Sequence, residues 1–273
     1  LDKMREPYKE DERFQKYEGY RDDGIDLARL KYEEMRQLRS DLQLIFQDPY
    51  SSLNPRMSVG QIIGESLVSH GFYTKNSPRL QDAIMGIMEE CGLASYFLHR
   101  YPHQFSGGQR QRIGIARSLA VHPKFVVCDE AVSALDVSIQ SQIINLLQDL
   151  KEQQHLTYLF ITHDLSVVKY ISDRIGVMYL GNLVELADSQ EIFDHPMHPY
   201  TEALLESIPT TEEKRDLAVL EGDIPSPVNP PKGCKFHTRC KYCTEICTHV
   251  VPDWEEVTPN HFVACHHKLH TNE

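Results

Sequence analysis

A short glycine-containing turn before a predicted helix is the part of the sequence best suited to bind an anion. The turn comprises Ser106, Gly107, Gly108 and Gln109. Ser106 is of a type that caps helices, since its hydroxyl can accept a hydrogen bond from a free backbone N–H, and the two glycines let a ligand approach the backbone closely. Free N–H groups and the positive end of the helix dipole favour an anion, so the turn predicts a phosphate site. Taken alone, it would also suit an ordinary capped helix.

Two adjacent carboxylates, Asp129 and Glu130, follow a run of four apolar residues at 125–128. One carboxylate can bind Mg²⁺ directly or through water, because Mg²⁺ prefers hard oxygen ligands. The next can accept a proton from a water molecule that attacks a phosphate. The pair therefore predicts metal-assisted phosphoryl chemistry; the alternative is a strand end with solvated acids.

Two further polar residues follow predicted strands. Gln47 comes after the predicted buried strand 42–46, and His163 comes after the predicted strand 157–161. Open α/β sheets bind ligands beyond the carboxyl ends of their strands, so both residues could join the acids. By itself Gln47 fits a polar turn, and a lone histidine at a strand end is more often structural.

Alternating helices and strands must position these residues. Leu27, Leu30, Met35 and Leu38 predict an amphipathic helix, and apolar spacing predicts further helices within 59–99, 106–120 and 137–153. Short apolar runs predict strands at 42–46, 124–130 and 157–161, and a closing antiparallel hairpin at 175–179 and 183–187 around Gly181-Asn182. Buried strands separated by helices predict a largely parallel sheet.

Composition narrows the functional classes. The formal net charge is −12, which disfavours a broad nucleic-acid surface. No apolar run approaches the ~20 residues needed to cross a bilayer, and no signal peptide is visible. Five of the seven cysteines follow residue 230. That clustering favours a metal site in a reducing compartment over a disulfide scaffold.

The motifs together resemble those of ATP-binding cassette (ABC) ATPases. In chain order, Gln47 resembles the Q-loop glutamine, 105–112 the signature, 129–130 the Walker B acids, 133–136 the D-loop and His163 the H-switch. Phe105 stands where leucine is commonest, and Ala131 where proline is usual. The stretch 46–55, Phe-Gln-Asp-Pro-Tyr-Ser-Ser-Leu-Asn-Pro, is similar to the peptide-importer branch.

The resemblance implies a role for each motif. The catalytic set would be Glu130 as base, with His163 and Gln47. Asp129 and Gln47 would bind Mg²⁺. Residues 106–109 would contact ATP across a dimer, and Asp136 of the D-loop would cross the same interface. The implied fold is α/β, a P-loop NTPase-like ABC nucleotide-binding domain with a helical subdomain, plus a small Cys-rich C-terminal extension.

The resemblance also implies partners and a place in the cell. These are a second ABC ATPase subunit in a homo- or heterodimer, two transmembrane permease subunits and an extracytoplasmic peptide-binding protein, on the cytoplasmic side of the membrane. The cargo would be oligopeptides or dipeptides. The alternatives are an ATPase-inactive regulatory remnant and a non-transport ABC protein that binds nucleic acid; the acidic charge and the Gln47-Asp48-Pro49 stretch oppose the latter.

The clustered cysteines resemble the C-terminal extension of oligopeptide and dipeptide importer ATPases. By that resemblance an iron–sulfur cluster would bind to Cys234, Cys240, Cys247 and Cys265, with Cys243 left over. Only Cys240 and Cys243 have the Cys-x-x-Cys spacing of a zinc knuckle, so zinc is the alternative. Metal-free thiols also remain open.

One expected motif is missing. The phosphate-binding loop Gly-x-x-x-x-Gly-Lys-[Ser/Thr] of such NTPases does not occur in the sequence. We therefore expect a chain that lacks its N-terminal Walker A segment and binds ATP weakly by itself. The expected division is a charged segment or insert at 1–22, the ABC ATPase domain at 23–207 and the extension at 208–273.

Overall fold

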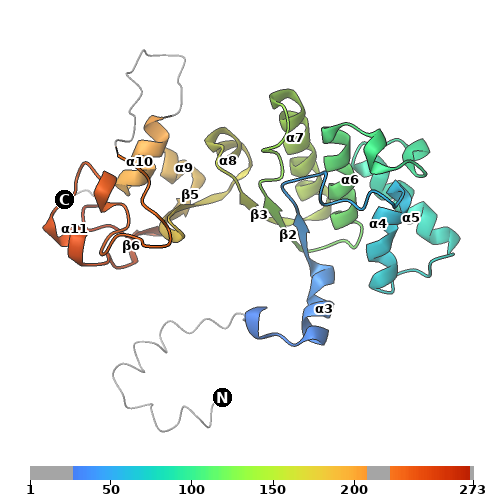
Figure 1. The fold of residues 1–273 in the computed structure, drawn as a ribbon, viewed down its shortest axis with the longest axis horizontal. Coiled ribbons are helices and arrows are strands. Elements are labelled where there is room, and N and C mark those ends of the chain that lie inside the picture. The colour runs from blue at the N-terminus through green and yellow to red at the C-terminus, as the bar shows by residue number, and fades with distance from the viewer. Residues whose placement is uncertain (1–26, 208–221, 271–273) are drawn as a thin grey trace, which may run out of the picture.

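A computed structural model describes residues 27–207 and 222–270. Three parallel strands form the middle of the molecule, with helices α4, α5 and α6 at one end and the C-terminal segments at the other (Figure 1). The expected segment 1–22 lies outside the described residues, as does most of the proline-rich stretch after residue 207. No helix in the described ranges combines the length and apolarity needed to span a membrane.

The parallel sheet has the order β1-β2-β3 and matches three predicted strands. Its strands are β1 (Leu42–Ile45), β2 (Phe125–Asp129) and β3 (Thr157–Ile161), and Leu42 pairs with Phe125, which pairs with Thr157. Because the strands are parallel and in register, their carboxyl ends lie at one edge of the sheet. The residues that follow them are therefore neighbours in space.

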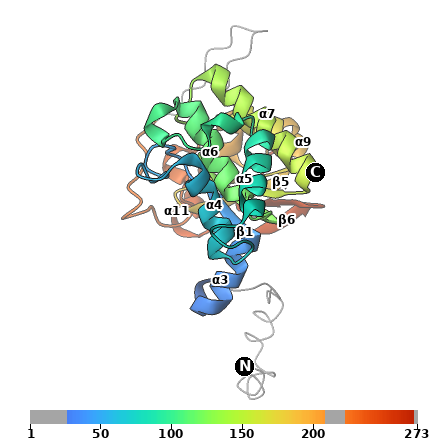
Figure 2. The same cartoon turned by 90° about the vertical axis from the view of Figure 1, so that its right-hand side faces the viewer.

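Helices pack around this sheet as the apolar spacing predicts. They are α4 (Val59–Ser69), α5 (Pro78–Glu90), α6 (Gly107–Leu119), α7 (Val137–Gln154) and α8 (Leu165–Ile171), with single 3-10 turns at Ser95–Phe97 and Pro102–Gln104. Helices α4, α5 and α6 pack on one another beside β1 (Figure 2). Ile63, Met88 and Ile113 contribute fully buried side chains to this core, and each such side chain stabilises the fold by about 1.5–3 kcal/mol.

The predicted first helix is only partly correct. The structure has a 3-10 turn at Leu27–Arg29 and a separate helix α3 at Tyr32–Asp41, and neither contains a buried residue. Leu27 is 45% exposed, while Met35 and Leu38 are half-buried. Apolar spacing predicts which residues share a helix face, but it does not predict how deeply that face is buried.

A second sheet is antiparallel, with the order β4-β5-β7-β6. Strands β4 (Arg174–Tyr179) and β5 (Asn182–Asp188) form the predicted hairpin. Its turn is Leu180-Gly181, one residue before the predicted Gly181-Asn182, because these two residues have the positive φ angles of 44° and 76° that a tight hairpin turn requires.

The C-terminal segment completes this second sheet through β6 (Glu255–Thr258) and β7 (His261–Val263), neither of which the sequence predicts. Strand β7 pairs with β5, where Leu186 lies opposite Phe262. Helices α9 (Ser189–Asp194), α10 (Pro199–Glu206) and α11 (Glu245–His249) and a 3-10 turn at His237–Arg239 surround it. The expectation of one mostly parallel sheet is therefore corrected: the described strands form a parallel and an antiparallel sheet.

Candidate active site

Glu130 contacts two other predicted site residues. Gln47 Nε2 donates a hydrogen bond of 2.6 Å to Glu130 Oε2, and His163 Nδ1 lies 3.4 Å from Glu130 Oε1. The three residues follow β1, β2 and β3, so the parallel register brings them together across 83 and 33 positions of sequence. The structure thus assembles Gln47, Glu130 and His163 at the carboxyl edge of the sheet.

The backbone at Glu130 is held in an uncommon conformation. Its φ angle is 45°, in the left-handed region that non-glycine residues seldom occupy. The Glu130 N–H donates to the Ile161 carbonyl at 2.9 Å, and the Ser133 hydroxyl donates to the Glu130 carbonyl at 3.0 Å. Such conformations cost on the order of 1–3 kcal/mol and cluster at functional sites.

Asp129 and Gln47 leave oxygen atoms for a cation. Asp129 is the last residue of β2 and is exposed, as is Gln47. Because Gln47 uses its Nε2 to contact Glu130, its amide oxygen is available as a hard ligand. One amide oxygen beside a carboxylate suits Mg²⁺, which binds few protein groups and keeps several water molecules.

The signature turn forms the predicted cap. Ser106 Oγ accepts from the Gln109 N–H at 3.3 Å, and Gln109 Oε1 accepts from the Ser106 N–H at 3.1 Å. A Cβ at Gly108 would overlap the side chain of Ile139 on α7, so packing as well as ligand access requires glycine there. Within the described chain, no hydrogen bond or ion pair links residues 106–109 to Glu130, Gln47 or His163.

Two arginines attach the signature helix α6 to the loop that carries Gln47. The Arg110 guanidinium lies 3.8 Å from the centroid of the Tyr50 ring, and its Nε donates to the Pro102 carbonyl at 2.7 Å. Seven residues on, the Arg117 guanidinium donates to the Ser52 carbonyl at 2.5 Å, and burial lowers the pKa of Arg117. Sequence reasoning missed both contacts; the available signal was two arginines spaced seven residues apart on one helix.

Asp136 is exposed and caps α7, where its Oδ1 accepts from the Ile139 N–H at 3.0 Å. The structure therefore gives this D-loop residue a local role in starting α7.

The four predicted cysteine ligands line one pocket, together with His198 and Phe236. Cys243 is exposed and does not line it. Burial, and then the neighbouring thiols, raise the pKa of Cys265 to about 12. Burial also raises the pKa of Cys240 to about 11. Among the described residues, however, no three His, Cys, Asp or Glu side chains converge closely enough to hold a metal ion.

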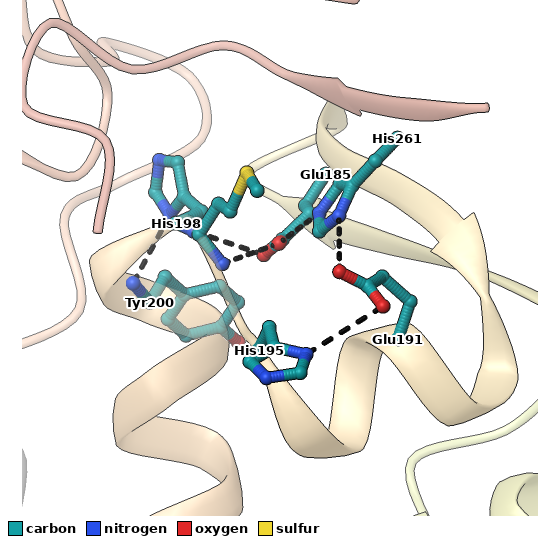
Figure 3. Close-up of polar contacts among 7 residues, drawn as sticks. Glu185, Glu191, His195, His198, Tyr200 and His261 are labelled. Carbon is teal, nitrogen blue, oxygen red and sulfur yellow. Dashed lines mark hydrogen bonds and ion pairs between the residues drawn. The ribbon is translucent and has the colours of Figure 1, made fainter. Parts of the chain in front are cut away.

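A buried carboxylate joins the C-terminal strands to β5 (Figure 3). Glu185 is fully buried and accepts hydrogen bonds from the Met197 N–H at 2.6 Å, the His198 N–H at 3.0 Å and His261 Nε2 at 2.7 Å. The sequence reasoning also missed this site. Its only signal was one acid inside the apolar strand Leu-Val-Glu-Leu-Ala.

A groove of about 820 Å³ lies over α4 and α5. Gln61, Val68 and Leu98 are among the residues that line it. Polar and apolar side chains both line this groove.

Comparison with known proteins identifies the family. A family model described as "ABC transporter" matches residues 14–133, and one described as "Oligopeptide/dipeptide transporter, C-terminal region" matches residues 184–247. The oligopeptide transport ATP-binding protein AppF of Bacillus subtilis is 52% identical over 248 residues, which cover 89% of this chain and 75% of AppF. The chain belongs to the ABC transporter family, among the oligopeptide transport ATP-binding proteins.

Other relatives agree with this assignment. The oligopeptide transport ATP-binding protein OppF of Salmonella typhimurium is 49% identical over 247 residues, covering 89% of this chain and 73% of OppF. Among solved structures, the ATP-binding cassette MJ0796 bound to ADP and Pi has a TM-score of 0.54 and 25% identity, covering 62% of this chain and 72% of that chain. CbiO1 from Clostridium perfringens has a TM-score of 0.53 and 25% identity, covering 60% and 63%.

The two family models divide the site residues. The ABC transporter model spans Gln47, the signature turn and the Walker B acids, whereas the C-terminal model spans Glu185 and three of the four pocket cysteines. Asp136 and His163 lie between the two matches, and Cys265 lies beyond the second. The fold is that of an ABC ATPase, which implies ATP and Mg²⁺ as its ligands.

Proposed function

We propose that this protein is the ATP-binding subunit of an importer for oligopeptides or dipeptides and couples ATP hydrolysis to their passage through membrane permeases. The observation that carries the proposal is the contact of Glu130 with both Gln47 and His163 at the edge of the parallel sheet. A carboxylate in that position can take a proton from water. The relatives named above are oligopeptide transport proteins, which supports the choice of cargo.

Each residue at the sheet edge has a proposed role in hydrolysis. Glu130 accepts a proton from the attacking water, Gln47 orients that water, and the exposed His163 contacts the γ-phosphate. Asp129 and the amide oxygen of Gln47 bind Mg²⁺, whose charge offsets the negative charge of the phosphates. The strained backbone at Glu130 fixes the direction of its carboxylate before ATP arrives.

The signature turn would serve the ATP of a second ABC subunit. Its first-turn N–H groups favour phosphate, and Ser106 is exposed. No described contact joins the turn to Glu130 of the same chain, which supports a role across a dimer interface for residues 106–109. The exposed Asp136 would lie at that interface.

The Walker A motif Gly-x-x-x-x-Gly-Lys-[Ser/Thr] does not occur in the printed sequence. We also propose the division of the chain into a charged segment at 1–22, the ABC ATPase domain at 23–207 and the C-terminal extension at 208–273. With ATP and Mg²⁺, these 273 residues should show little binding by isothermal titration, because the missing loop supplies most phosphate contacts. Micromolar affinity would contradict this.

The groove over α4 and α5 is the proposed docking site of a permease on the cytoplasmic side of the membrane. The exposed Gln61 lines it, so a Gln61→Cys variant should crosslink to the permease in the assembled transporter. A Ser138→Cys variant on the exposed start of α7 is the matched control. Both belong in a Cys243→Ser background, because Cys243 is itself exposed. Equal crosslinking of the two variants would remove the groove from the proposal.

The decisive test of the proposed function is Glu130→Gln in the assembled transporter. ATP binding should persist while hydrolysis and peptide uptake fall about 10²–10⁴-fold, the usual loss when a general base is removed. Glu191→Gln, on the distant helix α9, should leave turnover unchanged. Near wild-type hydrolysis in Glu130→Gln would refute Glu130 as the base.

We further propose that the cysteine pocket holds an iron–sulfur cluster. A cluster binds its four thiolates through two or four iron atoms, so the sulfurs need to line a common space rather than converge on one ion. That matches four cysteines that share a pocket without forming a single-ion site. Anaerobically purified protein should contain iron and sulfide. Zinc in their place would support the same four ligands but refute the iron–sulfur cluster. Free thiols in the folded protein would refute the metal site altogether.

A further inference from the structure

Two hydrogen bonds hold His198 in place, one at its backbone N–H and one at its ring. Its N–H donates to Glu185 Oε2 at 3.0 Å, one residue after the Met197 N–H donates to Glu185 Oε1. Its ring nitrogen Nδ1 accepts from the Tyr200 N–H at 3.0 Å and so caps α10. Figure 3 shows the ring directed away from Glu185, with Nδ1 toward Tyr200. The imidazole therefore has little freedom to turn.

The hydrogen bond at Nδ1 determines where the ring proton lies. Since Nδ1 accepts from an N–H, a neutral ring carries its proton on Nε2. His198 is 1% exposed, and its Nε2 is a buried atom without a hydrogen-bond partner in the described structure. Such an unpaired donor costs about 1–3 kcal/mol unless something accepts from it.

The cysteine pocket is where an acceptor for Nε2 can be found. His198 lines that pocket with Pro199, Phe236 and the four cysteines. Pro199 and Phe236 offer no side-chain acceptor, and the Phe236 ring centroid lies 5.9 Å from that of His198. Apart from the ring nitrogens of the other histidines, sulfur atoms are the side-chain acceptors that the pocket supplies.

The other pocket histidines are engaged elsewhere. His266 Nε2 contacts the Val250 carbonyl at 3.0 Å, and His267 Nε2 contacts Thr244 Oγ1 at 2.6 Å. His237 Nδ1 contacts the Cys234 carbonyl at 2.8 Å. Of the four histidines that line the pocket, His198 is the one whose buried ring nitrogen is unpaired in the described residues.

We propose that His198 donates a hydrogen bond from Nε2 to a sulfur of the thiolate-bound cluster in the cysteine pocket and positions that cluster against the ATPase domain. This inference rests on the iron–sulfur proposal above. Hydrogen bonds to cluster sulfurs raise the reduction potential, because they stabilise the more negative reduced state. Outer-shell donors of this kind also slow loss of the metal. Through Glu185, the same residue connects the pocket to β5 of the ATPase domain.

The variant that tests the proposal is His198→Asn in the full chain, purified without oxygen. Asparagine is a good N-cap, so its side chain can still accept from the Tyr200 N–H, but it is too short to place a donor in the pocket. The cluster should form, with a lower reduction potential than wild type and faster loss of iron to a chelator. His198→Gln, which reaches further and retains an N–H donor, should recover part of the potential.

His195→Asn is the matched control. His195 is three residues away, its side chain is 58% exposed, and it contacts Glu191 at 3.6 Å rather than lining the pocket. The reduction potential and the rate of iron loss of the His195→Asn variant should equal those of wild type. An unchanged potential in His198→Asn would overturn the inference and leave the cluster proposal intact. Wild-type protein without iron and sulfide would overturn both.

Discussion

Replacement of Glu185 by glutamine should loosen strands β6 and β7 from β5. Oε1 of Glu185 accepts from the Met197 N–H and from His261 Nε2, and Oε2 accepts from the His198 N–H. A glutamine can keep the bonds to one oxygen, but its NH₂ group then faces a donor. At least one fully buried donor loses its acceptor, which costs about 1–3 kcal/mol. Alanine would leave all three donors unpaired and should cost roughly three times as much.

The single tryptophan makes this measurable. Trp254 directly precedes β6, and its ring stacks on Phe262 of β7 with centroids 6.0 Å apart, so its fluorescence reports on these strands. With a urea dependence of about 1–3 kcal/mol per molar, Glu185→Gln should lower the unfolding midpoint by on the order of 1 M. Glu191→Gln is the control. Glu191 is partly exposed, and its Oε1 lies 3.8 Å from His261 Nδ1, which is longer than a hydrogen bond. A Glu185→Gln midpoint equal to that of Glu191→Gln would refute the account of this network.

Three further outcomes test the remaining contacts. Gly108→Ala should lower both the thermal stability and the ATPase rate of the assembled transporter, because the added Cβ overlaps α7; unchanged values would contradict the packing account. Tyr50→Leu should slow hydrolysis while Tyr50→Phe does not, since phenylalanine retains the ring that contacts Arg110, worth about 0.5–2 kcal/mol; equal rates in both would remove that role. At about pH 9, iodoacetamide should modify the exposed Cys243 but spare Cys128, which is buried and whose pKa burial raises to about 12; mass spectrometry distinguishes the two.

The parts of the fold that could be predicted depend on local physics. The Ser106 cap, the start of α7 at Asp136 and the strand before Asp129 each follow from residues within a few positions. Parallel strands then bring their carboxyl ends together, so the contact of Gln47 and Glu130 follows from the order of elements. This is why the catalytic group could be proposed from the sequence.

The contacts that could not be predicted join residues that no sequence motif marks. Glu185 and His261 are 76 positions apart, and neither belongs to a motif. Each looks like a solvent-facing residue of a short strand until β7 pairs with β5 and excludes water from both. The contact of Arg110 with Tyr50 is a similar case, because an arginine after the signature turn would ordinarily face solvent.

The arrangement of α6 explains why its polar residues need tertiary contacts. Arg110 and Arg117 anchor the helix to its surroundings. Both hold the loop that follows Gln47, and Gln47 in turn contacts Glu130. Contacts therefore extend from α6 through this loop to Glu130. An arginine whose guanidinium contacts a carbonyl or an aromatic ring supplies that connection, and an apolar residue at either position would not.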